Sequence, residues 1–242
     1  MNEIITLIMS IADNIVKIEE KILDACHKAG RKRETITLMG VSKFHPVELI
    51  EEASKAGISY FGESRVQEGV AKFESFKKDH PDIQVHLIGS LQRNKAKTAY
   101  SFFDCIQSVD REALITELVK TAGSGLRDKP LPLLLELHTG EESKSGFANF
   151  DELFKAAALV LSSDLLRPKG LMTIAPYTQD KEEIRSSFRL LAKAQCELVK
   201  RFPPAENWAC LSMGMSNDFD IAIEEGSTMI RIGSSIFGER NV

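Results

Sequence analysis

Eight short apolar segments, each separated from the next by a longer amphipathic segment, run through this chain of 242 residues. The short segments are rich in Val, Ile, Leu and Met and predict β-strands, at residues 36–42, 58–62, 85–89, 104–109, 133–138, 170–174, 208–211 and 229–232. Apolar residues recur at helical spacing between them, in residues 47–56, 65–78, 91–100, 111–122, 150–161, 181–201 and 217–225. Because strands that alternate with helices are joined by right-handed crossovers, the pattern predicts a parallel sheet.

Two observations favour a closed sheet over a doubly wound open sheet, which is the alternative. No G-x-G-x-x-G motif follows the first predicted strand, so the main signature of a dinucleotide-binding open sheet is missing. Most predicted strands also end in small or polar residues, as at Ser42-Lys43 and Gly233-Ser234. In a (β/α)8 barrel these ends share one rim, where active sites lie. We therefore expect an α/β fold, a single (β/α)8 TIM barrel domain of residues 1–242 with an extra N-terminal helix.

The extra helix is predicted from isoleucines at helical spacing, which are Ile4, Ile8, Ile11, Ile15, Ile18 and Ile22. We expect no signal peptide here, because Glu3 rather than a basic residue precedes the segment and charged residues follow it directly. No apolar run approaches the ~18 residues that a membrane span needs. The sequence therefore predicts a cytoplasmic protein without membrane contact.

Charge and cysteine content narrow the classes of ligand. The chain has 31 Lys and Arg against 35 Asp and Glu, a net charge of −4, so it has no general attraction to nucleic acid or to anionic membranes. The four cysteines lie far apart and no pair has C-x-x-C spacing, which argues against a zinc ribbon or a disulfide framework. We expect no nucleic-acid binding, no metal site and, because the barrel pairs all of its own strands, a monomer.

Two basic residues stand at the predicted rim of the barrel. Lys43 follows the first predicted strand, where partial desolvation lowers the pKa of an amine and leaves it able to attack a carbonyl. The alternative is a lysine whose ammonium lies in water. Arg231 interrupts the apolar last strand, and a buried guanidinium needs a partner. That partner is either a ligand or, as the alternative, a carboxylate such as Glu63 in a structural ion pair.

Two segments have the composition of anion-binding loops. Residues 212–217 (SMGMSN) lead from the seventh strand into a helix, with Ser216 as its expected N-cap. Gly233 and the serines after it follow the eighth strand, and a glycine there lets backbone amides approach a ligand closely. Barrels often bind phosphate with the loops after strands seven and eight. Ordinary capping is the alternative, and Asp218 and Asp220 count against an anion at the first loop.

Closure of the barrel would bring these features together. Strands one and eight become neighbours and strand seven lies beside eight, so Lys43, Arg231 and both loops meet on one arc of the rim. An amine, a fixed cation and a phosphate site together suit pyridoxal 5′-phosphate. The lysine would hold the aldehyde of this cofactor as a Schiff base, and the loops would hold its phosphate.

A series of motifs identifies a family that the chain resembles. In order they are FGE at 61–63, VQE at 66–68, HLIG at 86–89, SVD at 108–110, GEESKSG at 140–146, GLMTIAP at 170–176, LSMGMS at 211–216 and RIG at 231–233. With these motifs the sequence resembles the pyridoxal phosphate homeostasis proteins, also called YggS-like proteins, over essentially its whole length. The resemblance implies a barrel like the N-terminal domain of alanine racemase, pyridoxal 5′-phosphate as the cofactor, and a role in the homeostasis of this form of vitamin B6.

The same resemblance implies the roles of individual residues. Lys43 matches the lysine that holds the cofactor, and Arg231 matches an arginine that faces the pyridine nitrogen. The other cofactor-binding positions are Met172, Ser212, Ser216, Gly233 and Ser234, of which the last three hold the phosphate. The chain departs from the family at Ser64, where asparagine is usual, and at Ser90, where histidine is common. Lys144 matches a family lysine in a surface loop, where a solvated side chain is the alternative to a second ligand contact.

The cation beside the ring nitrogen bears on what such a site can catalyse. It disfavours protonation of that nitrogen and weakens the ring as an electron sink, which argues against an aminotransferase. In alanine racemase-like enzymes a second acid–base group, a tyrosine, comes from a C-terminal domain. The present sequence ends at Val242, and none of Tyr60, Tyr100 and Tyr177 lies in a comparable segment.

We therefore expect a binding protein without efficient catalysis, which buffers the cofactor or delivers it, with recipient apo-enzymes as partners. The first alternative is a pyridoxal-phosphate-dependent amino-acid racemase whose missing base comes from a partner subunit or from water. The second is an aldolase without a cofactor, in which Lys43 forms a Schiff base with a phosphorylated sugar.

Overall fold

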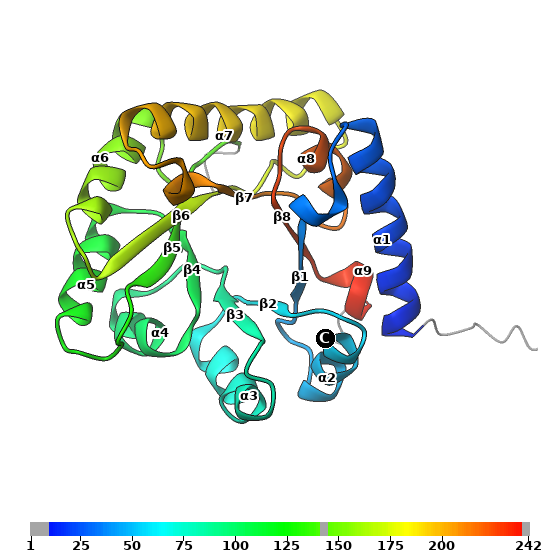
Figure 1. The fold of residues 1–242 in the computed structure, drawn as a ribbon, viewed down its shortest axis with the longest axis horizontal. Helices are drawn as coiled ribbons and strands as arrows, with labels where there is room; N and C mark the ends of the chain where they lie inside the picture. Colours follow the sequence, from blue (N-terminus) through cyan, green and yellow to red (C-terminus); the bar gives the residue numbers. More distant parts are fainter. Residues whose placement is uncertain (1–9, 141–144, 239–242) are drawn as a thin grey trace, which may run out of the picture.

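A closed barrel of eight parallel strands, in sequence order, forms the centre of the molecule (Figure 1). The computed structural model describes residues 10–140 and 145–238. The strands are β1 (Thr37–Val41), β2 (Tyr60–Glu63), β3 (Gln84–Leu87), β4 (Cys105–Val109), β5 (Leu131–Glu136), β6 (Leu166–Met172), β7 (Cys210–Ser212) and β8 (Met229–Ile232). Strand β8 pairs with β1 in parallel, and Met39 lies opposite Arg231 across this seam. The closed sheet confirms the predicted barrel and excludes the open sheet.

Helices surround the strands on the outside of the barrel (Figure 1). They are α1 (Ile11–Lys28), α2 (Val47–Lys55), α3 (Val66–Asp79), α4 (Ala96–Phe102), α5 (Glu112–Ala122), α6 (Phe150–Leu161), α7 (Lys181–Arg201), α8 (Phe219–Glu224) and α9 (Ser234–Phe237), with short 3-10 helices η1 (Arg33–Thr35), η2 (Arg93–Lys95) and η3 (Ala205–Trp208). Outward-facing strand residues pack against them, as Phe61 of β2 does against Phe73 of α3, with ring centroids 5.5 Å apart. The largest buried side chain, Trp208, donates its indole N–H to the carbonyl of Phe202 at 2.7 Å. None of the helices in the described part of the chain is long and apolar enough to cross a membrane.

Helix α1 is the predicted extra N-terminal helix. Its isoleucines Ile11, Ile15, Ile18 and Ile22 are all buried, and the helix packs against α2, α8 and α9. Ser10 begins it with a reciprocal cap, in which the serine hydroxyl accepts from the Asp13 backbone and the Asp13 carboxylate accepts from the Ser10 backbone. Ile4 and Ile8 lie outside the described residues.

Each predicted strand and helix is present, and its bounds lie within two residues of the prediction except at β6 and α4. Strand β8 and helices α6 and α7 have the predicted bounds, whereas β6 begins at Leu166 and not at 170, and α4 begins at Ala96 after the short helix η2. Pro168 hid the start of β6, because proline is rare inside a sheet. The structure accommodates it at a register shift against β5, directly before Gly170. Gly170 has φ +148°, and a Cβ there would lie 1.9 Å from the Cys210 carbonyl oxygen, so only glycine fits.

The interior of the barrel is partly apolar and partly polar. Cys105, Leu134 and Met172 form a small buried apolar cluster of their own. A second group of inward-facing side chains is polar and is held by hydrogen bonds between strands; its members are His86, Gln107, Ser212 and Arg231. The sequence pattern shows which residues alternate in direction along each strand, but it does not predict that this part of the interior is polar.

Candidate functional site

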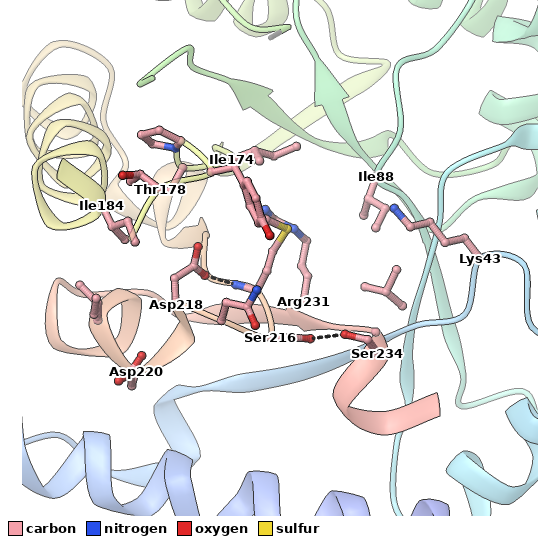
Figure 2. Close-up of a pocket in the computed structure, with 18 of the residues that line it drawn as sticks. Lys43, Ile88, Ile174, Thr178, Ile184, Ser216, Asp218, Asp220, Arg231 and Ser234 are labelled. Carbon is pink, nitrogen blue, oxygen red and sulfur yellow. Dashed lines mark hydrogen bonds between the residues drawn. The ribbon is translucent and has the colours of Figure 1, made fainter. Parts of the chain in front are cut away.

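A cavity of about 830 Å³ opens at the carboxyl ends of the strands. Its wall includes Lys43 after β1, Ser216 after β7, Arg231 within β8, and Gly233 and Ser234 after β8. Figure 2 shows Lys43 extending into the cavity from one side, towards Ile88, while Arg231, Ser216 and Ser234 lie across from it. The structure therefore brings together five of the seven predicted site residues, which are far apart in the sequence.

The loop that carries Lys43 has a strained backbone. Phe44, the next residue, has φ +66°, and no other non-glycine residue in the described part of the chain has a positive φ. On either side the loop is fixed by backbone hydrogen bonds, from Ser42 N–H to the Gly62 carbonyl at 3.1 Å and from His45 N–H to the Ser42 carbonyl at 3.0 Å. Such strain persists only where the surroundings hold the backbone in place. Lys43 itself is half-buried.

A buried polar cluster behind this loop provides that support. Glu63, which is fully buried, accepts from the Ser42 hydroxyl at 2.7 Å and from the Lys72 ammonium at 2.9 Å. Lys72 also donates to the Ser42 carbonyl at 2.8 Å and pairs with Glu68 at 2.7 Å, and Glu68 accepts from the Phe44 N–H at 2.5 Å. Burial raises the pKa of Glu63, and Lys72 opposes this rise. The cluster ties the Lys43 loop to β2 and α3.

Arg231 is a buried cation fixed by β7 and by the residue that follows β6. The residue is only 4% exposed. Its guanidinium donates to the Ser212 carbonyl at 2.6 Å, to the Ser212 hydroxyl at 2.7 Å and to the Thr173 carbonyl at 2.8 Å. Burial lowers the pKa of Arg231, and the nearby carboxylates Asp218 and Glu136 oppose this. The ion pair with Glu63 considered as an alternative is not formed, because Glu63 faces α3 and binds Lys72.

Two serine hydroxyls converge at the other wall of the cavity. Ser216 and Ser234 come from the loops after β7 and β8, and their Oγ atoms are 3.4 Å apart (Figure 2). Ser234 also begins the short helix α9, in which the N–H groups of Ile236 and Phe237 donate to the Gly233 carbonyl. The prediction that Ser216 caps α8 is wrong. The cap residue is Asp218, whose carboxylate accepts from the Met215 N–H and closes the loop, which leaves the Ser216 hydroxyl beside the cavity.

Comparison with known proteins gives the family. The family model for the alanine racemase N-terminal domain matches residues 17–241. A relative from Vibrio cholerae, named pyridoxal phosphate homeostasis protein, is 41% identical over 96% of this chain and 97% of its own length. One of the same name from Aquifex aeolicus is 39% identical over 96% and 99%. The chain belongs to the pyridoxal phosphate homeostasis protein family.

Solved structures agree with this placement. PipY of Synechococcus elongatus, solved with pyridoxal phosphate bound, is 33% identical to this family member, with a TM-score of 0.81 over 95% of this chain and 100% of that chain. Alanine racemase from E. faecalis has a TM-score of 0.70 at 15% identity over 96% of this chain and 59% of that chain, a likeness of fold. The family resemblance seen in the sequence motifs is therefore confirmed, together with the barrel.

The other positions singled out from the sequence of this family member do not lie together. Met172 packs in the barrel interior with Cys105 and Leu134, and Ser212 lies beneath Arg231; the structure brings neither of them to the cavity wall. Ser64 lines the cavity, whereas Ser90 is exposed outside it. Lys144 lies outside the described residues.

Several wall residues were not predicted from the sequence. The segment after β6 and the start of α7 supply one side of the cavity, with Ile174, Thr178 and Ile184 labelled in Figure 2. Their place could have been inferred, because the loop after every barrel strand faces the same rim. His45 also lines the cavity and stacks on Phe237 of α9, with ring centroids 5.0 Å apart. Within residues 10–140 and 145–238 no three His, Cys, Asp or Glu side chains are grouped as ligands for a metal ion.

Proposed function

We propose that this protein binds pyridoxal 5′-phosphate on Lys43 and takes part in the homeostasis of this cofactor in the cytoplasm, without efficient turnover of a substrate. The observation that carries the proposal is the convergence of a lysine amine, a buried guanidinium and a pair of hydroxyls on one cavity. The names of the relatives and the pyridoxal phosphate bound to PipY support it.

The residues present fit the chemistry of this cofactor. A phosphate group accepts hydrogen bonds and carries negative charge, and the Ser216 and Ser234 hydroxyls supply donors for it. Lys43 supplies an amine for the aldehyde, which it would hold as a Schiff base with loss of water. Arg231 supplies a positive charge that its neighbours hold in place from two strands.

The position of Arg231 explains why the site would store the cofactor in preference to using it. When bound, pyridoxal 5′-phosphate supplies a ring that withdraws electrons from an attached amine most strongly when its nitrogen is protonated. A guanidinium beside that nitrogen would disfavour a proton there, because like charges repel each other. Arg231 would therefore make the ring a weak electron sink, and its hydrogen bonds to Ser212 and Thr173 hold the guanidinium in place.

The other predicted features complete the proposal. Ser212 acts on the cofactor through Arg231, and Met172 supports the interior beneath the site. Residues 1–242 act as one cofactor-binding domain and, since the closed barrel leaves no strand edge for pairing, as a monomer. Recipient apo-enzymes then take the cofactor from the cavity, whose mouth opens to solvent beside the exposed Tyr177.

Spectroscopy and mass analysis of the purified protein test the proposal. Protein incubated with pyridoxal 5′-phosphate should be yellow, and borohydride should fix the pyridoxyl group on the peptide that contains Lys43. Lys43→Ala should abolish this adduct, whereas Lys181→Ala, which removes another lysine from the same cavity wall, should retain it. An adduct that persists in Lys43→Ala contradicts the assignment of Lys43. A colourless protein whose Lys43 reacts with a sugar phosphate would favour the aldolase instead.

Proton exchange tests the statement that turnover is inefficient. The loaded protein is incubated with D- or L-alanine in heavy water, and loss of the α-proton is followed by NMR. We expect exchange close to that of free pyridoxal 5′-phosphate. Exchange at rates typical of enzymes, on the order of 1–10³ per second, would contradict the storage function and favour a racemase.

A further inference from the structure

A line of hydrogen bonds crosses the interior of the barrel from Arg231 to His86. The Arg231 guanidinium donates to the Ser212 hydroxyl at 2.7 Å, that hydroxyl donates to the Gln107 carbonyl oxygen Oε1 at 2.6 Å, and the Gln107 amide nitrogen lies 2.8 Å from His86 Nδ1. The four side chains come from β8, β7, β4 and β3, and each residue is at least nine-tenths buried. They form one connected, buried network.

The direction of every bond in this network follows from the donors available. A guanidinium has donors and no acceptor, so the Ser212 oxygen must accept from Arg231. The single proton of Ser212 is then free to go to Gln107 Oε1, which turns the amide nitrogen of Gln107 towards His86. As an N–H2 group this nitrogen donates, so His86 Nδ1 must accept and must carry no proton.

The surroundings of the Gln107 amide support the same orientation. Its nitrogen lies 3.2 Å from the sulfur of Met229 and 4.0 Å from that of Met39. A thioether sulfur accepts weakly and does not donate, so it suits an N–H2 group and not a carbonyl oxygen. With the amide turned over, the Ser212 proton would also lose its acceptor in a buried site, which is costly.

The proton state of His86 agrees with this network. Burial lowers the pKa of His86 to about 4, which keeps the ring neutral at physiological pH. The edge of the ring meets Tyr60, with centroids 5.6 Å apart and planes at 90°. His86 is therefore a fixed end of the network, held by packing on one side and by the Gln107 amide on the other.

We propose that Gln107 is a positioning residue for Arg231. By taking the Ser212 proton, Gln107 leaves a lone pair of Ser212 for the guanidinium and fixes the charge of Arg231 at one place in the cavity floor. The neutral His86 holds the Gln107 amide in the orientation that this requires. Through Arg231, Gln107 would then influence the pKa of the ring nitrogen of a bound cofactor. This consequence rests on the proposed function.

Two measurements test the inference, one of which needs no cofactor. In the protein without cofactor, NMR of 15N-labelled arginine side chains follows solvent exchange of the Arg231 Nη protons. We expect Gln107→Met, which keeps the size of the side chain, to accelerate this exchange by about tenfold or more, the effect of losing one buried hydrogen bond. In the loaded protein, the pH midpoint of the visible band should move upward by about one unit, because a less restrained guanidinium opposes ring protonation less.

Two further variants separate positioning from general loosening of the barrel. Gln107→Glu keeps an acceptor for the Ser212 proton and should leave the Nη exchange near the wild-type value; the visible band is not compared in this variant, because a carboxylate near Arg231 changes ring protonation by its own charge. Cys105→Ala removes a buried inward-facing side chain of the same strand outside the network and should leave both readouts unchanged. If Gln107→Met fails to fold, Ser212→Ala interrupts the same network and should give the same two changes.

The outcomes decide the inference separately from the proposed function. Unchanged Nη exchange in Gln107→Met or Ser212→Ala overturns it, as does an equal change in Cys105→Ala. A wild-type protein that binds no pyridoxal 5′-phosphate would contradict the proposed function, while the exchange measurement would still support or overturn the positioning of Arg231 by Gln107.

Discussion

Replacing Lys72 with methionine should destabilise the protein strongly, and the loss should depend on pH. Methionine keeps most of the lysine stem but removes the ammonium that contacts the Ser42 carbonyl, Glu63 and Glu68 at 2.7–2.9 Å. Glu63 is fully buried and already has one carboxylate oxygen without a hydrogen bond. Lys72→Met therefore leaves a buried charge with the Ser42 hydroxyl as its remaining partner.

The size of the effect follows from the burial of the pair. Removing one partner of a buried ion pair costs about 3–5 kcal/mol, and the 13% exposure of the Lys72 side chain lets some water reach the site, so we expect about 3 kcal/mol at pH 7. For a chain of this length the melting temperature should fall by about 6–12 °C. Thermal and urea unfolding measure both quantities.

The pH dependence identifies Glu63 as the cause. Burial raises the pKa of Glu63 above its unfolded value, so the folded state holds its proton more tightly, and stability is lost as pH rises through the folded pKa. Without Lys72 this pKa rises further. The deficit of Lys72→Met should therefore be largest at pH 7–8 and shrink towards pH 5, and Glu63→Gln should rescue much of it at pH 7.

A matched control uses the exposed pair of Lys55 and Glu51, whose side chains are 72% and 50% exposed. Lys55→Met should cost no more than about 0.5 kcal/mol, as expected for an exposed pair on a helix. The reasoning is refuted if Lys72→Met costs less than about 1 kcal/mol at pH 7, or if its deficit is the same at pH 5 and pH 8.

Three further predictions concern other parts of the barrel. Gly170→Ala should lower the free energy of unfolding, measured with urea, by more than about 4 kcal/mol, because its Cβ would overlap a carbonyl of β7. As a control, Gly57→Ala, at φ +99° with open space around it, should lower it by about 1 kcal/mol. Asn149→Ala removes the side-chain cap of α6 and should cost about 1 kcal/mol, seen as a lower melting temperature. Burial raises the pKa of Glu136, so its ionisation disfavours the fold as pH rises; the melting temperature of Glu136→Gln relative to wild type should increase from pH 4 to pH 8, and a flat difference would contradict this.

Much of the fold follows from the order and period of apolar segments. Eight strands alternating with helices leave few solutions, and closure alone places the first strand beside the last. Closure therefore predicts that Lys43 and Arg231 meet, because one follows β1 and the other lies in β8. The loops after β7 and β8 were located by the same reasoning.

What the sequence could not predict depends on contacts between distant segments. Alternation along β4 gives the direction of Gln107, but its partners Ser212 and His86 come from other strands, and their relative heights depend on the stagger of the barrel. Ser216 had the right chemistry for an N-cap, yet Asp218 lies closer to the helix and its carboxylate closes the loop. The start of β6 was missed because Pro168 is tolerated where the register shifts, which no local pattern reveals.

On the proposed function, the pairing of β1 with β8 would make cofactor binding depend on a complete barrel. A nascent chain in which only β1 to β7 had been synthesised would contain Lys43 but neither Arg231 nor Ser234. It would offer an amine to the cofactor without the complete phosphate site. Formation of the Schiff base at Lys43 would then require that β8 has paired with β1. On the proposed function, yellow protein would therefore be protein in which β8 has paired with β1.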